Sequence, residues 1–251
     1  MNYQNKTIVV TGGAKGMGAA TAKLFFDQGA NVASLDVSAD TSNINDKRWM
    51  FLHCDVSNET EIKNAFENIH QQFGSIDFLV NNAGIQRYGT VTETSTEEWD
   101  LVMNVNLKSL FLCSKCAIPF MLQNDKGVII NVASVQAFLS QQKVAAYTTA
   151  KSAILGLTRS IAVDYSPQIR CVAVCPGTID TPMLRESIAL SPDPDEVMQE
   201  CINMHLTKRI GTPEEVAELI LYLCDDKASF ITGQAIRIDG GLGITIQGSK
   251  R

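Results

Sequence analysis

A tyrosine and a lysine that could exchange protons with a substrate stand four residues apart, at Tyr147 and Lys151. The run from Ala145 to Val163 is expected to be helical, so both side chains share one helical face, and Ser134 lies upstream. An isolated phenol has a pKa of about 10 and is a poor acid or base near neutral pH. Lowering that pKa to about 7 requires about 4 kcal/mol, which a cation about 4 Å away supplies in a partly desolvated pocket. The pair therefore predicts proton transfer, although so short a motif also occurs by chance as a core tyrosine beside a solvated lysine.

A glycine-rich turn follows the first expected strand. The run K-T-I-V-V-T at 6–11 predicts a buried strand, and helical periodicity begins after G-G-A-K-G-M-G at 12–18. Glycines let backbone N–H groups approach a pyrophosphate, and a helix N-terminus adds partial positive charge. The turn therefore predicts a dinucleotide site that includes Gly12, Lys15, Gly16, Met17 and Gly18.

Two charged residues bear on which dinucleotide would bind. Asp36 ends the second expected strand and lies 24 residues after Gly12. This is close to the spacing of about 20 residues for a carboxylate that binds the adenosine ribose 2′-hydroxyl, and it would repel a 2′-phosphate. Lys15 could pair with that phosphate instead, or it could be a solvated loop side chain. Because we give the carboxylate more weight, we expect NAD rather than NADP.

Strands and helices alternate along the whole chain. The strands are expected at 6–11, 31–36, 49–53, 76–80, 127–132, 169–174 and 234–239. Helices are expected at about 19–28, 57–73 with Ser57 as N-cap, 99–122, 145–163 and 212–223. This alternation predicts right-handed βαβ crossovers, a parallel sheet and one doubly wound α/β domain over residues 1–251.

The residues with chemical potential fall at or just past strand carboxyl ends, where ligands bind in open α/β sheets. They are Gly12, Asp36, Asp55, Asn82, Ser134 and Pro176. Residues 178–211 form an insertion directly after one of these ends, with two short helices expected at Pro182 and Pro194. The insertion is either a substrate lid or a pair of surface helices without a gating role.

Composition excludes several other classes of protein. The chain has 45% hydrophobic and 19% charged residues, a net charge of −6 and no run of Lys and Arg, which argues against a nucleic-acid or anionic-membrane surface. No apolar run approaches the roughly 20 residues of a membrane span, and the N-terminus has no secretory pattern, so we expect a cytoplasmic enzyme. The seven cysteines, including the C-x-x-C at Cys113 and Cys116, are expected to be buried free thiols. The three histidines are dispersed, and no metal site is expected.

The chain resembles the short-chain dehydrogenase/reductase family from end to end. The matching motifs are T-G-G-A-K-G-M-G at 11–18, Asp55, N-N-A-G at 81–84, Asn106, Ser134, Y-x-x-x-K at 147–151, P-G at 176–177 and D-G-G at 239–241. The gap of 13 residues between Ser134 and Tyr147 also matches. The resemblance implies a Rossmann-type domain, with a seven-stranded parallel sheet in the order 3-2-1-4-5-6-7, and an NAD(P)-dependent dehydrogenase of CH–OH groups.

The resemblance also implies a role for each position. Tyr147 would be the general acid/base, and Lys151 would lower the pKa of Tyr147 and hold the nicotinamide ribose. Ser134 would bind the substrate oxygen, and Asn106 would hold a water that passes the proton from Lys151 to solvent. The other implied cofactor contacts are Asp36 for the adenosine ribose, Asp55 and Val56 for adenine, Asn82, Ala83 and Gly84 for the linking ribose, Pro176 and Gly177, and Ile179 and Thr181 for the carboxamide.

Within the family, the segments at 84–89, 134–137 and 175–182 are most similar to aldose dehydrogenases. Gln86 and Gln136 could hydrogen-bond sugar hydroxyls, or they could face solvent as most glutamines do. Arg87 and Arg185 could reach the anionic group of an acidic sugar. The alternative is a dehydrogenase of a short hydroxy acid or another secondary alcohol. Relatives of that kind carry a cation just before the tyrosine, where this chain has V-A-A at 144–146.

Two other classes are disfavoured. A non-catalytic dinucleotide sensor or scaffold would typically lack part of the Ser, Tyr and Lys set, and a serine hydrolase would need a G-x-S-x-G turn. The resemblance implies a homotetramer in which the helices at 99–122 and 147–164 pair across one two-fold axis. The last helix and strand would pair across another, and the tail from Leu242 to Arg251 would reach a neighbouring pocket.

Overall fold

A seven-stranded parallel sheet runs through the centre of the computed structural model, which describes residues 3–39 and 42–244. Its order is β3-β2-β1-β4-β5-β6-β7, which confirms the expected topology. The strands are β1 (Thr7–Thr11), β2 (Asn31–Asp36), β3 (Trp49–His53), β4 (Phe78–Asn81), β5 (Gly127–Val132), β6 (Ile169–Pro176) and β7 (Ala235–Ile238).

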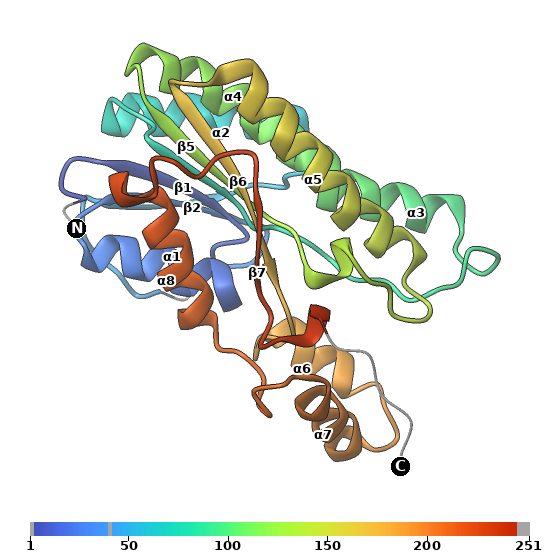
Figure 1. The fold of residues 1–251 in the computed structure, drawn as a ribbon. Helices are drawn as coiled ribbons and strands as arrows, with labels where there is room; N and C mark the ends of the chain where they lie inside the picture. Colours follow the sequence, from blue (N-terminus) through green and yellow to red (C-terminus); the bar gives the residue numbers. More distant parts are fainter. Residues whose placement is uncertain (1–2, 40–41, 245–251) are drawn as a thin grey trace.

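Helices cover both faces of the sheet (Figure 1). On one face lie α1 (Gly16–Asp27) and α8 (Pro213–Cys224), and on the other lie α2 (Glu59–Phe73), α4 (Ser109–Gln123) and α5 (Ala145–Tyr165). The sequence of strand β1 is continuously apolar because both faces of the strand are buried. Ile8 and Val10 belong to the core beneath α1 and α8, Val9 belongs to the core beneath α2 and α4, and none of the three is exposed.

Two helices begin at other residues than expected. Helix α1 starts at Gly16, inside the glycine turn, rather than at about residue 19. Helix α2 is capped by Asn58 and not by Ser57, because Asn58 Oδ1 accepts hydrogen bonds from the N–H groups of Thr60 and Glu61. The hydroxyl of Ser57 donates to Asp55 instead. Both residues are common caps, so local composition did not distinguish them.

The single helix expected from residue 99 to 122 is three consecutive segments. They are α3 (Thr96–Met103), a π-helical turn η1 (Asn104–Lys108) and α4. The whole segment from Thr96 to Gln123 has 28 residues, and its most apolar 18-residue window has a mean hydropathy of 1.3. By length and composition alone it could therefore span a membrane, contrary to our expectation from the sequence. Half of its most apolar window is buried inside the fold, and the core helices of globular proteins meet the same criteria.

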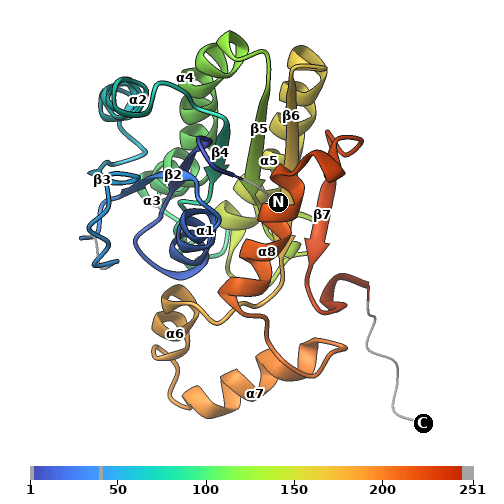
Figure 2. The ribbon, with the colours of Figure 1, turned by 90° about the vertical axis from the view of Figure 1, so that its left-hand side faces the viewer.

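The insertion after β6 forms two helices, as expected. Helices α6 (Pro182–Ile188) and α7 (Pro194–Met204) lie beyond the carboxyl ends of the strands (Figure 2). The remaining elements are the 3₁₀ turns η2 (Val135–Ala137), η3 (Asp226–Ala228) and η4 (Leu242–Ile244). The tail expected to reach a neighbour continues past η4 into 245–251, which lie outside the described residues.

All seven cysteines are free thiols, and Cys116 and Cys201 are half-buried while the other five are buried. The cysteine prediction was therefore wrong about burial at these two positions. Among residues 3–39 and 42–244, no group of three or more His, Cys, Asp or Glu side chains could hold a metal ion.

The cap of α2 gives the first prediction. Replacing Asn58 with Ala removes an acceptor for two N–H groups and should lower the free energy of unfolding by about 1 kcal/mol in urea titrations. Ser57→Ala should have a smaller effect, because the Ser57 hydroxyl caps no helical N–H group in this structure. A larger loss for Ser57→Ala than for Asn58→Ala would contradict the assignment.

Candidate active site

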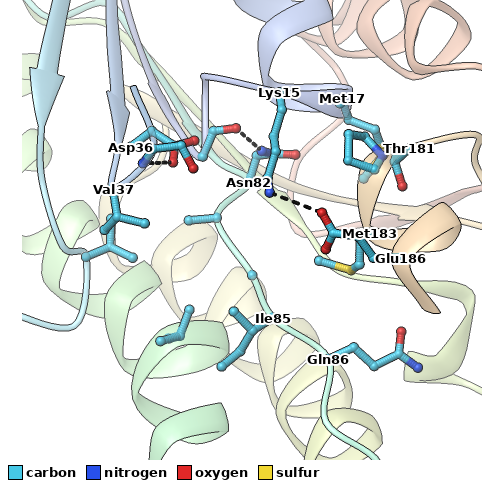
Figure 3. A pocket seen from close by; sticks show the side chains of 18 of the residues that line it. Lys15, Met17, Asp36, Val37, Asn82, Ile85, Gln86, Thr181, Met183 and Glu186 are labelled. Carbon is cyan, nitrogen blue, oxygen red and sulfur yellow. Dashed lines mark hydrogen bonds and ion pairs between the residues drawn. The ribbon is translucent and has the colours of Figure 1, made fainter. Parts of the chain in front are cut away.

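A cavity of about 690 Å³ opens at the carboxyl ends of β1, β2 and β4, and α6 forms its opposite wall (Figure 3). Its volume lies in the range of small-molecule and cofactor sites. Thirteen of the expected site residues line it: Gly12, Lys15, Gly16, Met17, Asp36, Asp55, Val56, Asn82, Ala83, Gly84, Gln86, Arg87 and Thr181. The structure therefore brings together the glycine turn, the acidic strand end and the N-N-A-G turn.

The glycine turn leaves its backbone open to the cavity. Gly12 has φ +64°, and a Cβ there would lie 2.9 Å from the Cα of Ala83. Gly16 has φ +58°, and a Cβ there would lie 3.3 Å from Cγ2 of Thr181. The N-cap residue Lys15 provides no side-chain hydrogen bond to the first N–H groups of α1. A helix start of this kind, next to a turn in which Gly12 and Gly16 carry no Cβ, fits the pyrophosphate of a dinucleotide.

Asp36 joins the end of β2 to the glycine turn. Its side chain is 8% exposed, and its Oδ2 accepts a hydrogen bond from Ala14 N at 3.0 Å while its Oδ1 accepts from Ser38 N at 2.8 Å. A carboxylate has about four acceptor positions, so two remain for ribose hydroxyls. The Asp36 carboxylate is thus held in place at the edge of the cavity.

Asp55 lies at the neighbouring strand end. Its Oδ1 accepts from both the N–H and the hydroxyl of Ser57, each at 2.8 Å, and its own N–H donates to Glu61 Oε2. Val56 is 6% exposed and lines the cavity beside it. Asp55 Oδ2 has no hydrogen bond among the described residues, so this part of the site can accept one from an amino group such as that of adenine.

The N-N-A-G turn is fastened to the end of β1. Asn82 Nδ2 donates to the carbonyl oxygens of Thr11 and Gly12, both at 3.0 Å, and Thr11 Oγ1 accepts from the N–H groups of Asn82 and Ala83. The amide of Asn82 therefore shapes the glycine turn, in addition to lining the cavity. A Cβ on Gly84 would lie 3.6 Å from Lys151 Nζ, so this turn also borders the expected proton-transfer group.

None of the four expected catalytic residues is part of the cavity lining. Lys151 is 4% exposed, Ser134 is 8% exposed, Asn106 is fully buried and Tyr147 is half-buried. Ser134 forms a side-chain hydrogen bond with Tyr147, and its Oγ accepts from the N–H of Gln136 at 3.1 Å. Nζ of Lys151 donates to the carbonyl oxygen of Val132 at 2.9 Å and lies 5.6 Å from the Tyr147 ring centroid.

The pKa of Tyr147 differs from the value of about 7 expected from the sequence. Burial raises the pKa of Tyr147 to about 12, although its hydrogen bond to Ser134 acts in the opposite direction. Burial also lowers the pKa of Lys151 to about 8. The prediction that Lys151 brings the Tyr147 pKa down to about 7 is therefore wrong for the protein alone. The reason is that desolvation disfavours both charges, while the Lys151 ammonium is directed to the Val132 carbonyl.

Asn106 occupies the π-helical turn η1, and its side chain is fully paired with one backbone segment. Its Oδ1 accepts from the N–H of Ile85 at 2.7 Å, and its Nδ2 donates to the Ile85 carbonyl at 2.8 Å. A water held by Asn106 would use the second lone pair of Oδ1 or the backbone. Turns of π-helix often occur at functional sites, and the apolar pattern of this segment gave no signal for one.

The expected substrate residues divide into two groups. Gln86 and Arg87 line the cavity, and Arg87 Nη1 donates to the carbonyl oxygen of Gln86. Gln136 is outside the lining, because its amide is 3.4 Å from both Gln141 Oε1 and Thr148 Oγ1. Arg185 is also outside it. The Arg185 guanidinium donates two hydrogen bonds of 2.8 and 2.7 Å to the carboxylate of Asp180. The guanidinium that was expected to bind an acidic sugar is therefore already paired with a carboxylate.

Besides Tyr147 and Lys151, four cofactor positions expected from the sequence do not line the cavity. Gly18 is in α1, and a Cβ there would clash with the Gly12 carbonyl oxygen. Pro176 is buried and Gly177 is half-buried, and a Cβ on Gly177 would lie 2.9 Å from Asp239 Cα. Ile179 is 7% exposed and lines a smaller cavity next to β7. These residues support the walls of the site or border its far end.

The structure adds lining residues that the motifs did not indicate. Tyr88 and Ser187 line the cavity and are joined by a hydrogen bond between their hydroxyl groups, which links the segment after β4 to α6. Met183, Glu186 and Leu190 come from the same insertion. Tyr88 lies only two residues after Gln86, so its proximity to that candidate was the one available signal.

Comparison with known proteins agrees with this geometry. A family profile described as enoyl-(acyl carrier protein) reductase matches residues 12–243. An uncharacterized oxidoreductase of Thermotoga maritima is 39% identical over 96% of this chain and 98% of its own length. A 2-(S)-hydroxypropyl-CoM dehydrogenase of Xanthobacter autotrophicus is 37% identical over 95% of this chain and 97% of its own. The ligand-free structure of Thermoplasma acidophilum aldohexose dehydrogenase superposes with a TM-score of 0.94 at 39% identity, covering 99% of this chain and 98% of that one.

The buried ammonium of Lys151 generates a prediction about pH. Its pKa is about 8 in the folded protein and 10.5 ordinarily, so between these values the unfolded chain binds the additional proton. Stability from this group therefore rises with pH across that window. From about pH 7 to about pH 10, wild type should gain about 2 to 3 kcal/mol relative to Lys151→Met in urea unfolding. A difference that does not change with pH would show that Lys151 stays charged when folded.

Proposed function

The chain belongs to the short-chain dehydrogenase/reductase family, and we propose that it transfers a hydride between NAD and a CH–OH group of an aldose or polyol. A bound nicotinamide would supply the hydride chemistry, and the side chains would handle the proton. The observation that carries the proposal is the convergence of Ser134 and Lys151 on Tyr147: the Ser134 side chain opposes the rise in the Tyr147 pKa, and Lys151 Nζ lies 5.6 Å from the Tyr147 ring centroid.

Each catalytic side chain can be given a task from its contacts. Ser134 holds the substrate oxygen beside the Tyr147 hydroxyl, and Tyr147 takes the proton during oxidation or returns it during reduction. Lys151 has three N–H donors and uses one on the Val132 carbonyl, so two remain for ribose hydroxyls. Its positive charge favours the phenolate when the ligands exclude water. Asn106 holds a water that connects Lys151 to solvent.

Polar groups in the cavity support a sugar substrate. Gln86 supplies an amide, Tyr88 and Ser187 supply hydroxyls, and together they can bond several substrate hydroxyls. The similarity to the archaeal aldohexose dehydrogenase supports the same class. Met183 and Leu190 complete the wall with apolar surface, which suits the faces of a sugar ring.

A second candidate substrate is a short secondary alcohol that carries an anionic group. Arg87 lines the cavity, and its only hydrogen bond among the described residues is to the neighbouring Gln86 carbonyl, so its guanidinium can reach an anion. The likeness to the hydroxypropyl-CoM dehydrogenase supports this alternative. Replacing Arg87 should then impair activity on the acidic alcohol much more than activity on a neutral sugar.

The proposal includes NAD as the cofactor and a homotetramer as the assembly. The fixed carboxylate of Asp36 supports NAD, because it accepts from ribose hydroxyls and repels a 2′-phosphate. Apolar side chains exposed on the outer helices support self-association: Phe111 on α4 is 50% exposed and Val163 on α5 is 80% exposed. A cytoplasmic location remains a prediction from the composition.

The assignment of Tyr147 has a direct test. Tyr147→Phe keeps the ring and removes the hydroxyl, so turnover should fall by at least about 10²-fold while NADH still binds. Binding would be followed by the change in NADH fluorescence, and turnover by the absorbance of the reduced nicotinamide. Turnover near the wild-type rate in this variant would refute the proposed mechanism.

The substrate class is tested with a panel of neutral aldoses, acidic sugars, hydroxy acids and secondary alcohols, each offered with NAD. Activity should be highest with an aldose, and Gln86→Ala should raise KM for it by about tenfold, because one or two hydrogen bonds to the sugar are lost. Gln199→Ala is the matched control, since Gln199 is exposed on α7, is bonded to Asn203 and lies outside the cavity lining. If no sugar is oxidised and a secondary alcohol is, the sugar proposal fails while the dehydrogenase stands.

A further inference from the structure

An ion pair crosses the cavity between the glycine turn and α6. Nζ of Lys15 lies 3.7 Å from Oε1 of Glu186, and the two side chains extend toward each other over the cleft (Figure 3). We propose that Glu186 strengthens the preference for NAD that Asp36 sets, because it holds Lys15 away from the adenosine ribose and so disfavours NADP. This inference rests on the proposed function only in requiring that the cavity binds a nicotinamide dinucleotide.

The charges around the cavity make Lys15 the decisive cation. Among the described residues, the charged side chains of the lining are Lys15, Asp36, Asp55, Arg87 and Glu186. Val37 and Ser38, which follow Asp36, carry no charge. Two of these side chains are cations. Arg87 belongs to the segment after β4, whereas Lys15 belongs to the glycine turn. A 2′-phosphate would need this cation, since it carries about −1.5 to −2 charges at neutral pH.

Asp36 cannot move away to admit such a phosphate without losing two hydrogen bonds. Its carboxylate is bound by the N–H groups of Ala14 and Ser38 and is 8% exposed. A phosphate on the adjacent ribose oxygen would therefore meet a fixed negative charge. Lys15 could offset that repulsion only if its ammonium turned from Glu186 toward the ribose, which would leave the Glu186 carboxylate unpaired beside a highly charged ligand.

The position of Glu186 is itself fixed by its neighbours. Helix α6 starts at the N-cap Thr181, whose side chain accepts from the N–H of Leu184, and the adjacent Ser187 is hydrogen-bonded to Tyr88 across the cleft. These contacts direct this face of α6 toward the cavity. Glu186 therefore faces the glycine turn because of the fold and not only because of its attraction to Lys15.

The size of the effect is limited by solvent. The side chains of Lys15 and Glu186 are 54% and 69% exposed, and exposed ion pairs are weak and screened by salt. Any repulsion between Glu186 and the pyrophosphate is common to NAD and NADP and cancels in the ratio of their affinities. The remaining preference should be roughly three- to tenfold in that ratio at low ionic strength.

The test is the ratio of the NADPH and NADH dissociation constants, measured by fluorescence titration of the purified full chain. Glu186→Gln should improve relative NADPH binding by roughly three- to tenfold at low salt, and less in high salt. Glu200→Gln is the matched control, because Glu200 is exposed on α7, outside the cavity lining, and its replacement changes the net charge equally. In Glu200→Gln the ratio of the NADPH and NADH dissociation constants should change by less than about twofold.

Lys15 must mediate the gain if the proposal is correct. In a double-mutant cycle, Lys15→Gln should abolish the improvement in relative NADPH binding that Glu186→Gln produces. In the wild-type background, Lys15→Gln alone should change the ratio of the NADPH and NADH dissociation constants much less. An equal gain without Lys15 would overturn the proposal, because it would indicate simple repulsion by Glu186. An unchanged ratio in Glu186→Gln, with NADH binding and melting temperature intact, would overturn it as well. If the wild-type protein bound neither dinucleotide, the proposed function would fail instead.

Discussion

The hydrogen bonds between the turn after β4 and the end of β1 hold the whole site in one frame. The amide of Asn82 donates to the carbonyls of Thr11 and Gly12, and the Thr11 hydroxyl accepts from two N–H groups of that turn. Parallel strands bring their carboxyl ends to one edge of the sheet, but the following segments still need fixing relative to each other. Here the fixed segment continues to Gly84, which borders Lys151. The glycine turn and Lys151 are thereby held in a fixed relation to each other.

Burial creates a conflict at the reacting end of the site. It raises the pKa of Tyr147 and lowers that of Lys151 to about 8, so burial disfavours the charged form of both groups, although Lys151 is still mostly an ammonium at neutral pH. The bond from Lys151 to the Val132 carbonyl compensates only part of the lost hydration. A dry site strengthens every interaction formed when ligands arrive, which is the arrangement that proton transfer to a substrate oxygen requires.

The proposed selectivity rests on the insertion after β6, where neighbouring side chains of α6 contact different surfaces. Arg185 pairs with Asp180, whereas Glu186 and Ser187 reach across the cavity to Lys15 and to the segment after β4. A short helix held at both walls of a cleft can influence both ends of a dinucleotide site. The same helix contributes the apolar residues that would contact a substrate.

The sequence by itself determined the architecture and the location of the site. Apolar runs such as Ile8 to Val10 predict strands buried on both faces, and residues that follow such strands must meet at one edge. Only the tertiary structure decided the partners of individual side chains: Lys151 with the Val132 carbonyl, Asn106 with Ile85, and Arg185 with its carboxylate. Periodicity reports which face of an element is buried. It does not report which of several distant groups a long polar side chain will reach, because that depends on how the elements pack and on what each bond offsets in lost hydration.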